Sequence, residues 1–106
     1  MLQKPGAPDI LSKVILIFLD RSPEIMQNLR DALAADDAAT VQRSAHSLKS
    51  SSANVGALNL SSLLREMESL GRANVLESAS ALFPLIEEEL KKVIGVLEGE
   101  LERRLP

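Results

Sequence analysis

AATVQRSAHSLKSSSAN, residues 38–54, carries a small or apolar side chain at four regularly spaced positions: Val41, Ala45, Leu48 and Ser52. Separations of four, three and four residues place these side chains on one face of an α-helix. The segment therefore predicts an amphipathic helix with a narrow buried stripe, which Val55 continues. Gly56 follows directly, where a glycine commonly ends a helix because it adopts a positive φ without strain.

Two more helices are predicted before this segment. Asp9 is a candidate N-cap for the first, whose apolar side chains surround much of its girth and predict that other helices largely cover it: Ile10, Leu11, Val14, Ile15, Ile17, Phe18 and Leu19. Ser22-Pro23-Glu24 predicts a new helix start, because serine caps helices, proline suits the first helical position and an acid suits the first turn. This second helix runs to Ala34, and Ala35-Asp36-Asp37 ends it and caps the next.

Two helices are also predicted after Gly56. Helical spacing up to Gly71 is kept by Leu60, Leu63, Leu64, Met67 and Leu70. Asn74 is a candidate cap for the last helix, in which Pro84 predicts a kink because proline removes a backbone donor. Short connections favour antiparallel neighbours. We predict an all-α fold, an antiparallel up-down four-helix bundle with a short additional N-terminal helix, in which residues 1–8 form a lead-in segment and residues 9–106 the bundle domain.

Composition argues against several functions. The chain has 106 residues, no cysteine, one histidine, 12 basic and 15 acidic residues and 2% aromatic residues. Thiol chemistry and disulfides are excluded, and one histidine cannot supply the ligand sets of many transition-metal sites. Interspersed charges and few aromatic rings give neither a basic face for a phosphate backbone nor a stacking platform for bases, so we expect no nucleic acid partner.

The sequence predicts no contact with a membrane. The longest apolar run, from Val14 to Leu19, is much shorter than the ~20 residues that span a bilayer. The first residues, Met1-Leu2-Gln3-Lys4-Pro5-Gly6, do not have the pattern of a signal peptide. We therefore expect a cytoplasmic protein. We also expect it to be a monomer.

His46 is the residue of the central helix with the clearest chemical potential. At roughly 100° per residue it points about 130° away from the buried stripe. Lys49, one turn later, can donate a charge-assisted hydrogen bond to a phosphoryl group on His46. From the helical wheel alone an ordinary surface histidine is the other interpretation, because an imidazole suits nucleophilic and acid–base roles but proves neither. Small or polar side chains on the same outward face leave room for a partner: Ala39, Gln42, Arg43, Ser50 and Ala53.

These residues carry a resemblance to a known family. Ala45-His46-Ser47-Leu48-Lys49-Ser50-Ser51-Ser52-Ala53-Asn54-Val55-Gly56-Ala57 resembles the signature of histidine phosphotransfer (HPt) domains, which runs roughly A-H-x-L-K-G-S-[SA]-x-x-x-G-A. Similar patterns flank it at Phe18-Leu19, Ser22-Pro23 and the segment from Leu60 to Glu68, so the resemblance covers nearly the whole chain. It implies a four-helix bundle whose histidine accepts a phosphoryl group from an aspartyl phosphate on one receiver domain and passes it to another.

The resemblance also implies roles for particular residues. By this resemblance, His46 is expected to be the phosphorylated residue, and Lys49 is expected to be the cation beside the phosphoryl group. Glu68 falls where family members often carry Gln or Glu, which implies a hydrogen bond to the ring nitrogen that is not phosphorylated; a solvated surface acid is an equal alternative. Ser50 stands where the family usually has glycine, and we expect docking to survive with a narrower set of partners. The receiver would dock on Ala39, Gln42, Arg43, Ser50 and Ala53.

No motif for independent phosphoryl transfer accompanies His46. The chain has no Gly-rich phosphate loop, no carboxylate cluster beside His46 and no nucleotide-binding signature. We therefore expect no autonomous kinase activity and no bound cofactor, and the resemblance implies that the receiver supplies Mg²⁺. Expected partners are receiver domains of response regulators and of a hybrid sensor kinase, of which the chain could itself be a part. The alternative is a helical adaptor that binds receivers or other signalling domains without being phosphorylated.

Overall fold

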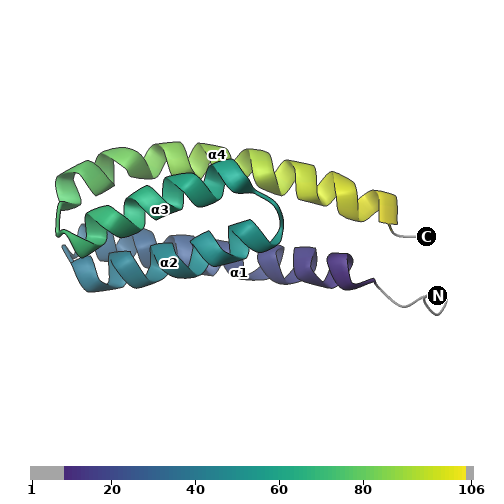
Figure 1. Cartoon of the computed structure of the whole chain (residues 1–106), viewed down its shortest axis with the longest axis horizontal. Helices are drawn as coiled ribbons and strands as arrows, with labels where there is room; N and C mark the ends of the chain where they lie inside the picture. The colour runs from purple at the N-terminus through teal and green to yellow at the C-terminus, as the bar shows by residue number, and fades with distance from the viewer. Residues whose placement is uncertain (1–8, 105–106) are drawn as a thin grey trace.

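The chain folds as a bundle of helices. A computed structural model describes residues 9–104, in which four helices follow one another: α1 (Ile10–Ala34), α2 (Ala38–Asn54), α3 (Leu58–Arg72) and α4 (Leu76–Arg104). Each helix packs antiparallel against the next, and α1 packs against α4 (Figure 1). The bundle is elongated, with principal-axis extents of 50 × 20 × 19 Å. The predicted all-α four-helix bundle is confirmed, whereas the expected lead-in segment, residues 1–8, lies outside the described residues.

The three turns between helices are built in the same way. A residue with positive φ follows the end of each helix: Asp36 at 53°, Gly56 at 78° and Asn74 at 58°. The next N–H then donates to the carbonyl oxygen five residues earlier, from Asp37 to Ala32 at 2.9 Å, from Ala57 to Ser52 at 2.8 Å and from Val75 to Leu70 at 2.9 Å. This Schellman arrangement satisfies carbonyl groups that the last helical turn leaves unpaired.

The turns confirm two predictions and correct a third. Gly56 ends α2 as predicted, and Asp37 caps α2 by accepting a hydrogen bond from the Thr40 N–H at 3.1 Å. Asn74 was expected to cap the start of the last helix. Instead its left-handed backbone ends α3, because asparagine tolerates this conformation better than most residues with a Cβ.

The helix break expected at Ser22-Pro23 does not occur. α1 is continuous from Ile10 to Ala34 with Pro23 inside it, and the Ser22 side chain is buried rather than capping a helix. Phe18 and Ile25, on either side of the proline, both pack into the core. Burial on both sides holds the helix together even though an internal proline costs about 3 kcal/mol. The additional N-terminal helix is therefore the first part of α1. α4 likewise runs without interruption through Pro84 and curves gently along the bundle (Figure 1).

The first turns of α1 are less covered than their composition predicted. Ile10 is 80% exposed and Ile17 is 60% exposed. α2 and α3 are shorter than the outer helices, so the start of α1 and the end of α4 extend together beyond the turn between α2 and α3 (Figure 1). Asp9 caps α1 as predicted, accepting from the Ser12 N–H at 2.6 Å, and its other oxygen accepts from Arg104 at 2.6 Å.

The core fixes the rotation of α2. The predicted stripe is confirmed, since Val41, Ala45, Leu48 and Ser52 are all fully buried. The Ser52 hydroxyl donates to the Leu48 carbonyl at 2.7 Å, so a polar side chain sits in the core without an unpaired group. Because one face of α2 is fully committed to the core, the opposite face points outward.

Candidate functional site

His46 stands on the outward face of α2. Its side chain is 61% exposed, as the position of the buried stripe predicted. The nearest polar neighbour across the bundle surface is Glu68 on α3, whose Oε2 lies 2.8 Å from the imidazole Nδ1. An ionised carboxylate can only accept a hydrogen bond, so this contact assigns the ring proton to Nδ1. The lone pair of the neutral ring is then on Nε2, on the other side of the ring.

Glu68 is a buried acid, not a solvated one. Only 8% of its side chain is exposed, which excludes the alternative that it is an ordinary surface residue. The Lys49 ammonium donates to its Oε1 at 2.7 Å, while His46 occupies Oε2. The hydrogen bond from Lys49 holds the pKa of the Glu68 carboxyl below its ordinary value, although burial acts to raise it; the hydrogen bond from His46 lowers it further. The carboxylate thus stays ionised between the two side chains of α2.

Lys49 is tied to Glu68 rather than free above the surface. Its side chain is 23% exposed and lies between α2 and α3. The Lys49 backbone is held as well, because the Ser61 hydroxyl of α3 donates to its carbonyl oxygen at 3.2 Å. The prediction placed Lys49 beside a phosphoryl group on His46; in the structure it reaches the site through the carboxylate it shares with His46.

Arg72 is a member of the site that sequence analysis missed. Its Nη2 lies 3.5 Å from Glu68 Oε2, the same oxygen that His46 Nδ1 contacts. The side chain is 61% exposed. Arg72 follows Glu68 by four residues on α3, and this spacing, which places opposite charges on one face of a helix, is the signal that could have found it.

A close approach of α2 and α3 brings the site together. Gly71 is buried where the two helices meet, and a Cβ at this position would lie 2.8 Å from the backbone nitrogen of Gln42 and 3.1 Å from its Cα. Only the absence of a side chain permits this contact. Gly71 therefore permits the close packing of α3, which carries Glu68, against α2, which carries His46.

The predicted docking face is largely accessible. Gln42 is half-buried beside Gly71, and Arg43 donates to the Thr40 hydroxyl at 3.0 Å. The other three positions are small side chains along the helix surface around His46, and they are exposed like Arg43: Ala39, Ser50 and Ala53. The structure thus leaves the surface around the imidazole open.

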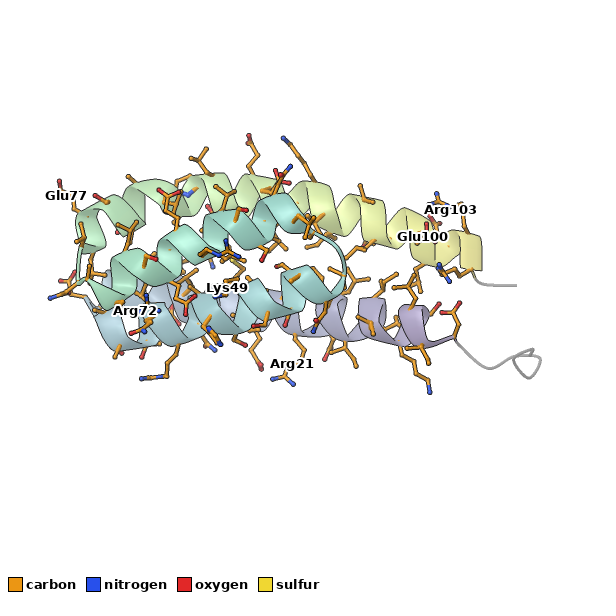
Figure 2. All side chains as sticks on the ribbon, viewed as in Figure 1. Arg21, Lys49, Arg72, Glu77, Glu100 and Arg103 are labelled. Carbon is orange, nitrogen blue, oxygen red and sulfur yellow. The ribbon has the colours of Figure 1, made fainter. Side chains whose placement is uncertain are left out.

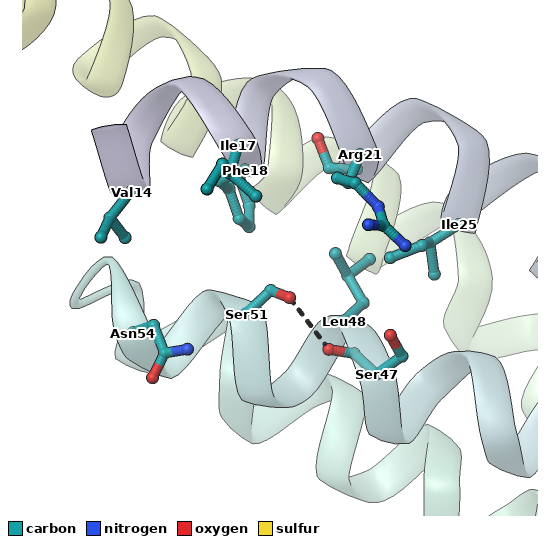
Figure 3. A pocket seen from close by; sticks show the side chains of 10 residues that line it. Val14, Ile17, Phe18, Arg21, Ile25, Ser47, Leu48, Ser51 and Asn54 are labelled. Atoms are coloured by element: carbon teal, nitrogen blue, oxygen red, sulfur yellow. Dashed lines mark hydrogen bonds between the residues drawn. The ribbon is translucent and has the colours of Figure 1, made fainter. Parts of the chain in front are cut away.

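A groove between α1 and α2 adjoins this face. It has a volume of about 340 Å³, with an apolar floor that includes Phe18, Ile25 and Leu48 (Figure 3). Polar side chains complete its lining, among them Arg21 from α1 and Ser47, the neighbour of His46 in sequence. Sequence analysis did not predict this groove, because its two walls come from different helices.

The described residues contain neither a metal-binding cluster nor a membrane span. Between residues 9 and 104, no three His, Asp or Glu side chains gather as metal ligands would. No helix in this same part of the chain is long and apolar enough to cross a bilayer.

Comparisons with known proteins identify the family of this chain. The family model of the Hpt domain matches residues 13–96. Histidine-containing phosphotransfer protein B (HptB) from Pseudomonas aeruginosa PAO1 has a similar crystal structure, with a TM-score of 0.84, 28% sequence identity and coverage of 95% of this chain and 98% of that one. No curated protein sequence matches the chain. The family match includes residues of all four helices, His46 and Glu68 among them, and the chain belongs to the Hpt domain family, whose members transfer phosphoryl groups through a histidine in phosphorelays.

Proposed function

We propose that Nε2 of His46 accepts a phosphoryl group from the aspartyl phosphate of one receiver domain and passes it to the aspartate of another. The observation that carries this proposal is the 2.8 Å contact between the exposed His46 imidazole and the buried Glu68 carboxylate. It holds the proton on Nδ1 and leaves the lone pair of Nε2 on the accessible side of the ring. An ordinary surface histidine has no such partner.

The transfer follows from this arrangement. The Nε2 lone pair attacks phosphorus in line, and a nitrogen–phosphorus bond forms while the bond from phosphorus to the aspartate oxygen breaks. The electron pair of the broken bond returns to the aspartate as a carboxylate. The Nδ1 proton stays on the ring, where Glu68 offsets the positive charge that develops on the imidazole. Lys49 keeps Glu68 in place and adds positive charge beside the phosphoryl group.

This chain leaves part of the chemistry to its partner. We propose that Mg²⁺ is held by the receiver domain, where it neutralises charge on the phosphoryl oxygens during transfer. The domain contributes a rigidly positioned nucleophile and has no kinase activity of its own, in keeping with the lack of a nucleotide-binding motif in its sequence. Whether it works alone or within a hybrid sensor kinase does not change these roles.

The receiver is proposed to dock over the exposed face of α2 as a one-to-one complex in the cytoplasm. Stable interfaces bury about 800 Å² on each partner, so a receiver centred on His46 must extend over neighbouring helices. The groove between α1 and α2 offers an apolar floor on one side of His46. Arg72 and the end of α3 lie on the other side. No observation favours the alternative of an unphosphorylated adaptor.

Labelling from a phosphorylated receiver tests this function. A receiver domain carrying radioactive aspartyl phosphate is mixed with the protein and Mg²⁺. We expect label on this protein that is lost in acid and kept in base, as phosphohistidine requires. A parallel incubation with nucleotide triphosphate and Mg²⁺ alone is expected to give no label. Absence of transfer from a broad panel of receivers would favour the adaptor, and labelling by nucleotide alone would show an independent kinase.

The Glu68→Ala variant is expected to take up the phosphoryl group about ten- to a hundredfold more slowly, the range typical when a side chain that orients a functional imidazole is removed. Alanine removes the carboxylate that accepts from His46 Nδ1 and from Lys49. Initial rates of transfer from a phosphorylated receiver measure the effect, and circular dichroism checks that the variant is folded. A variant with unchanged rates would show that Glu68 has only a structural role.

A further inference from the structure

Positive charge is in excess around His46 before any phosphoryl group arrives. Glu68 is one carboxylate in contact with two cations, Lys49 and Arg72, and with the His46 imidazole. A phosphoryl group on a side chain adds a charge of about −1.5 to −2 near neutral pH. One of the two cations can therefore turn to the phosphoryl group while the other continues to balance Glu68.

The two cations are held very differently. Lys49 makes the short contact, 2.7 Å to Oε1, and most of its side chain is buried between α2 and α3. Arg72 makes the long contact, 3.5 Å to Oε2, and most of its side chain is in solvent. Arg72 also shares its oxygen with His46 Nδ1, whereas Lys49 is the sole side-chain partner of Oε1 among the described residues.

Release of the two cations has unequal consequences. If Lys49 left, the buried carboxylate would lose its closest cation and Oε1 would have no donor, a costly state for a charged group out of water. If Arg72 left, Oε1 would keep Lys49 and Oε2 would keep His46. Arg72 is therefore the cation that can move at small cost.

We propose that Arg72 binds the oxygens of the phosphoryl group on His46, while Lys49 remains on Glu68 as a positioning residue. This inference rests on the proposed function of His46. Arg72 Nη2 and His46 Nδ1 are both in contact range of the same Glu68 oxygen, so the guanidinium already lies beside the imidazole. Its planar fork of donors suits two phosphoryl oxygens at once, and a single ammonium group does not. When the phosphoryl group leaves, Arg72 returns to Glu68.

Chemical phosphorylation tests this assignment without a receiver. Phosphoramidate, a small phosphoryl donor, labels histidine directly: the bond from Nε2 to phosphorus forms, the phosphorus–nitrogen bond of the donor breaks and ammonia leaves. Followed by ³¹P NMR, the Arg72→Ala variant is expected to take up the group about tenfold more slowly than the wild type, because it loses a charge-assisted contact. The second pKa of its phosphoryl group is expected to rise, since a nearby cation favours the doubly ionised form. Arg72→Lys is expected to recover part of both effects.

Two further variants separate direct contact from general charge. Arg103→Ala removes one positive charge at the opposite end of the molecule, where Arg103 is paired with Glu100, and is expected to behave as the wild type (Figure 2). Lys49→Met is expected to change the ¹⁵N signals of the His46 ring in the unphosphorylated protein, because it disturbs Glu68, and Arg72→Ala is expected to leave them unchanged.

The results distinguish failure of this inference from failure of the proposed function. If Arg72→Ala takes up the phosphoryl group at the wild-type rate with an unchanged phosphoryl pKa, Arg72 does not bind the group. If only Lys49→Met raises that pKa, Lys49 is the phosphoryl ligand instead. If the wild type takes no label from phosphoramidate or from receivers, the proposed function is wrong, and the proposed role of Arg72 is then wrong as well.

Discussion

The His46→Gln variant is expected to take no phosphoryl label from a receiver domain that labels the wild type. Glutamine has a similar polarity but lacks a ring nitrogen with a free lone pair, so no nitrogen–phosphorus bond can form. The fold should be unaffected, because the side chain is exposed and lies outside the core. Labelling measures the loss, and thermal unfolding should place the stability within about 0.5 kcal/mol of the wild type.

A second exposed position on the same helix provides the control for His46. Ser50→Gly introduces the residue usual in the family one turn after His46, and it is expected to keep the label at a cost of up to about 1 kcal/mol in helix stability. Label that persists on His46→Gln would place the phosphoryl group on another residue. The serines beside His46 would then be the first candidates, and stability of the label in acid would identify them.

The Gly71→Ala variant is expected to lose about 2 kcal/mol of folding free energy, although alanine is the better helix former. Its new Cβ would meet Gln42 backbone atoms at 2.8 and 3.1 Å and Val41 Cγ1 at 3.1 Å. Backbone atoms cannot rotate away as a side chain can, so α3 must move from α2. The melting temperature is expected to fall on the order of 10 °C. Phosphoryl uptake should also fall, because the shift separates Glu68 from His46.

Gly95→Ala is the matched control for this change. Gly95 lies inside α4, and a Cβ there would have nothing within 4 Å. The variant is expected to gain about 0.5–1 kcal/mol from helix propensity alone. Calorimetric melting of both variants checks the prediction. A Gly71→Ala protein as stable as the wild type would show that α2 and α3 can separate at no cost, and that the glycine is not needed for their contact.

Local patterns predicted the helices better than their ends. The stripe of Val41, Ala45, Leu48 and Ser52 is fully buried as predicted. Helical spacing places these side chains on one face, and a helix buries the face that carries its apolar side chains. The predicted helix break at Pro23 was wrong, because it relied on local signals alone. Proline and a preceding serine are local signals for a helix start, but core contacts on both sides of Pro23 outweigh them. Asn74 shows the same limit, since its residue type suits either end of a helix.

Site features within one helix were predicted from the sequence, whereas those that depend on contacts between helices were not. His46 and Lys49 lie on one helix, so their spacing and the outward direction of His46 were visible in the chain itself. The depth of Glu68 was not visible, because its burial depends on how closely α3 approaches α2. Arg72 was missed because its relevance depends on that same contact. The groove between α1 and α2 has one wall from each helix and could not be predicted from either.

The amino-acid sequence by itself determined the helical class, the buried stripe of α2, the exposed position of His46 and the resemblance to the Hpt family. Each of these depends on residues within a few helical turns of one another, where spacing alone decides direction. The tertiary structure alone decided that α1 is one helix, that Glu68 is a buried carboxylate shared by His46, Lys49 and Arg72, and that Gly71 lies where α3 meets α2. These features depend on contacts between helices. The free energy of such packing exceeds that of the local conformational preferences on which a prediction from sequence relies.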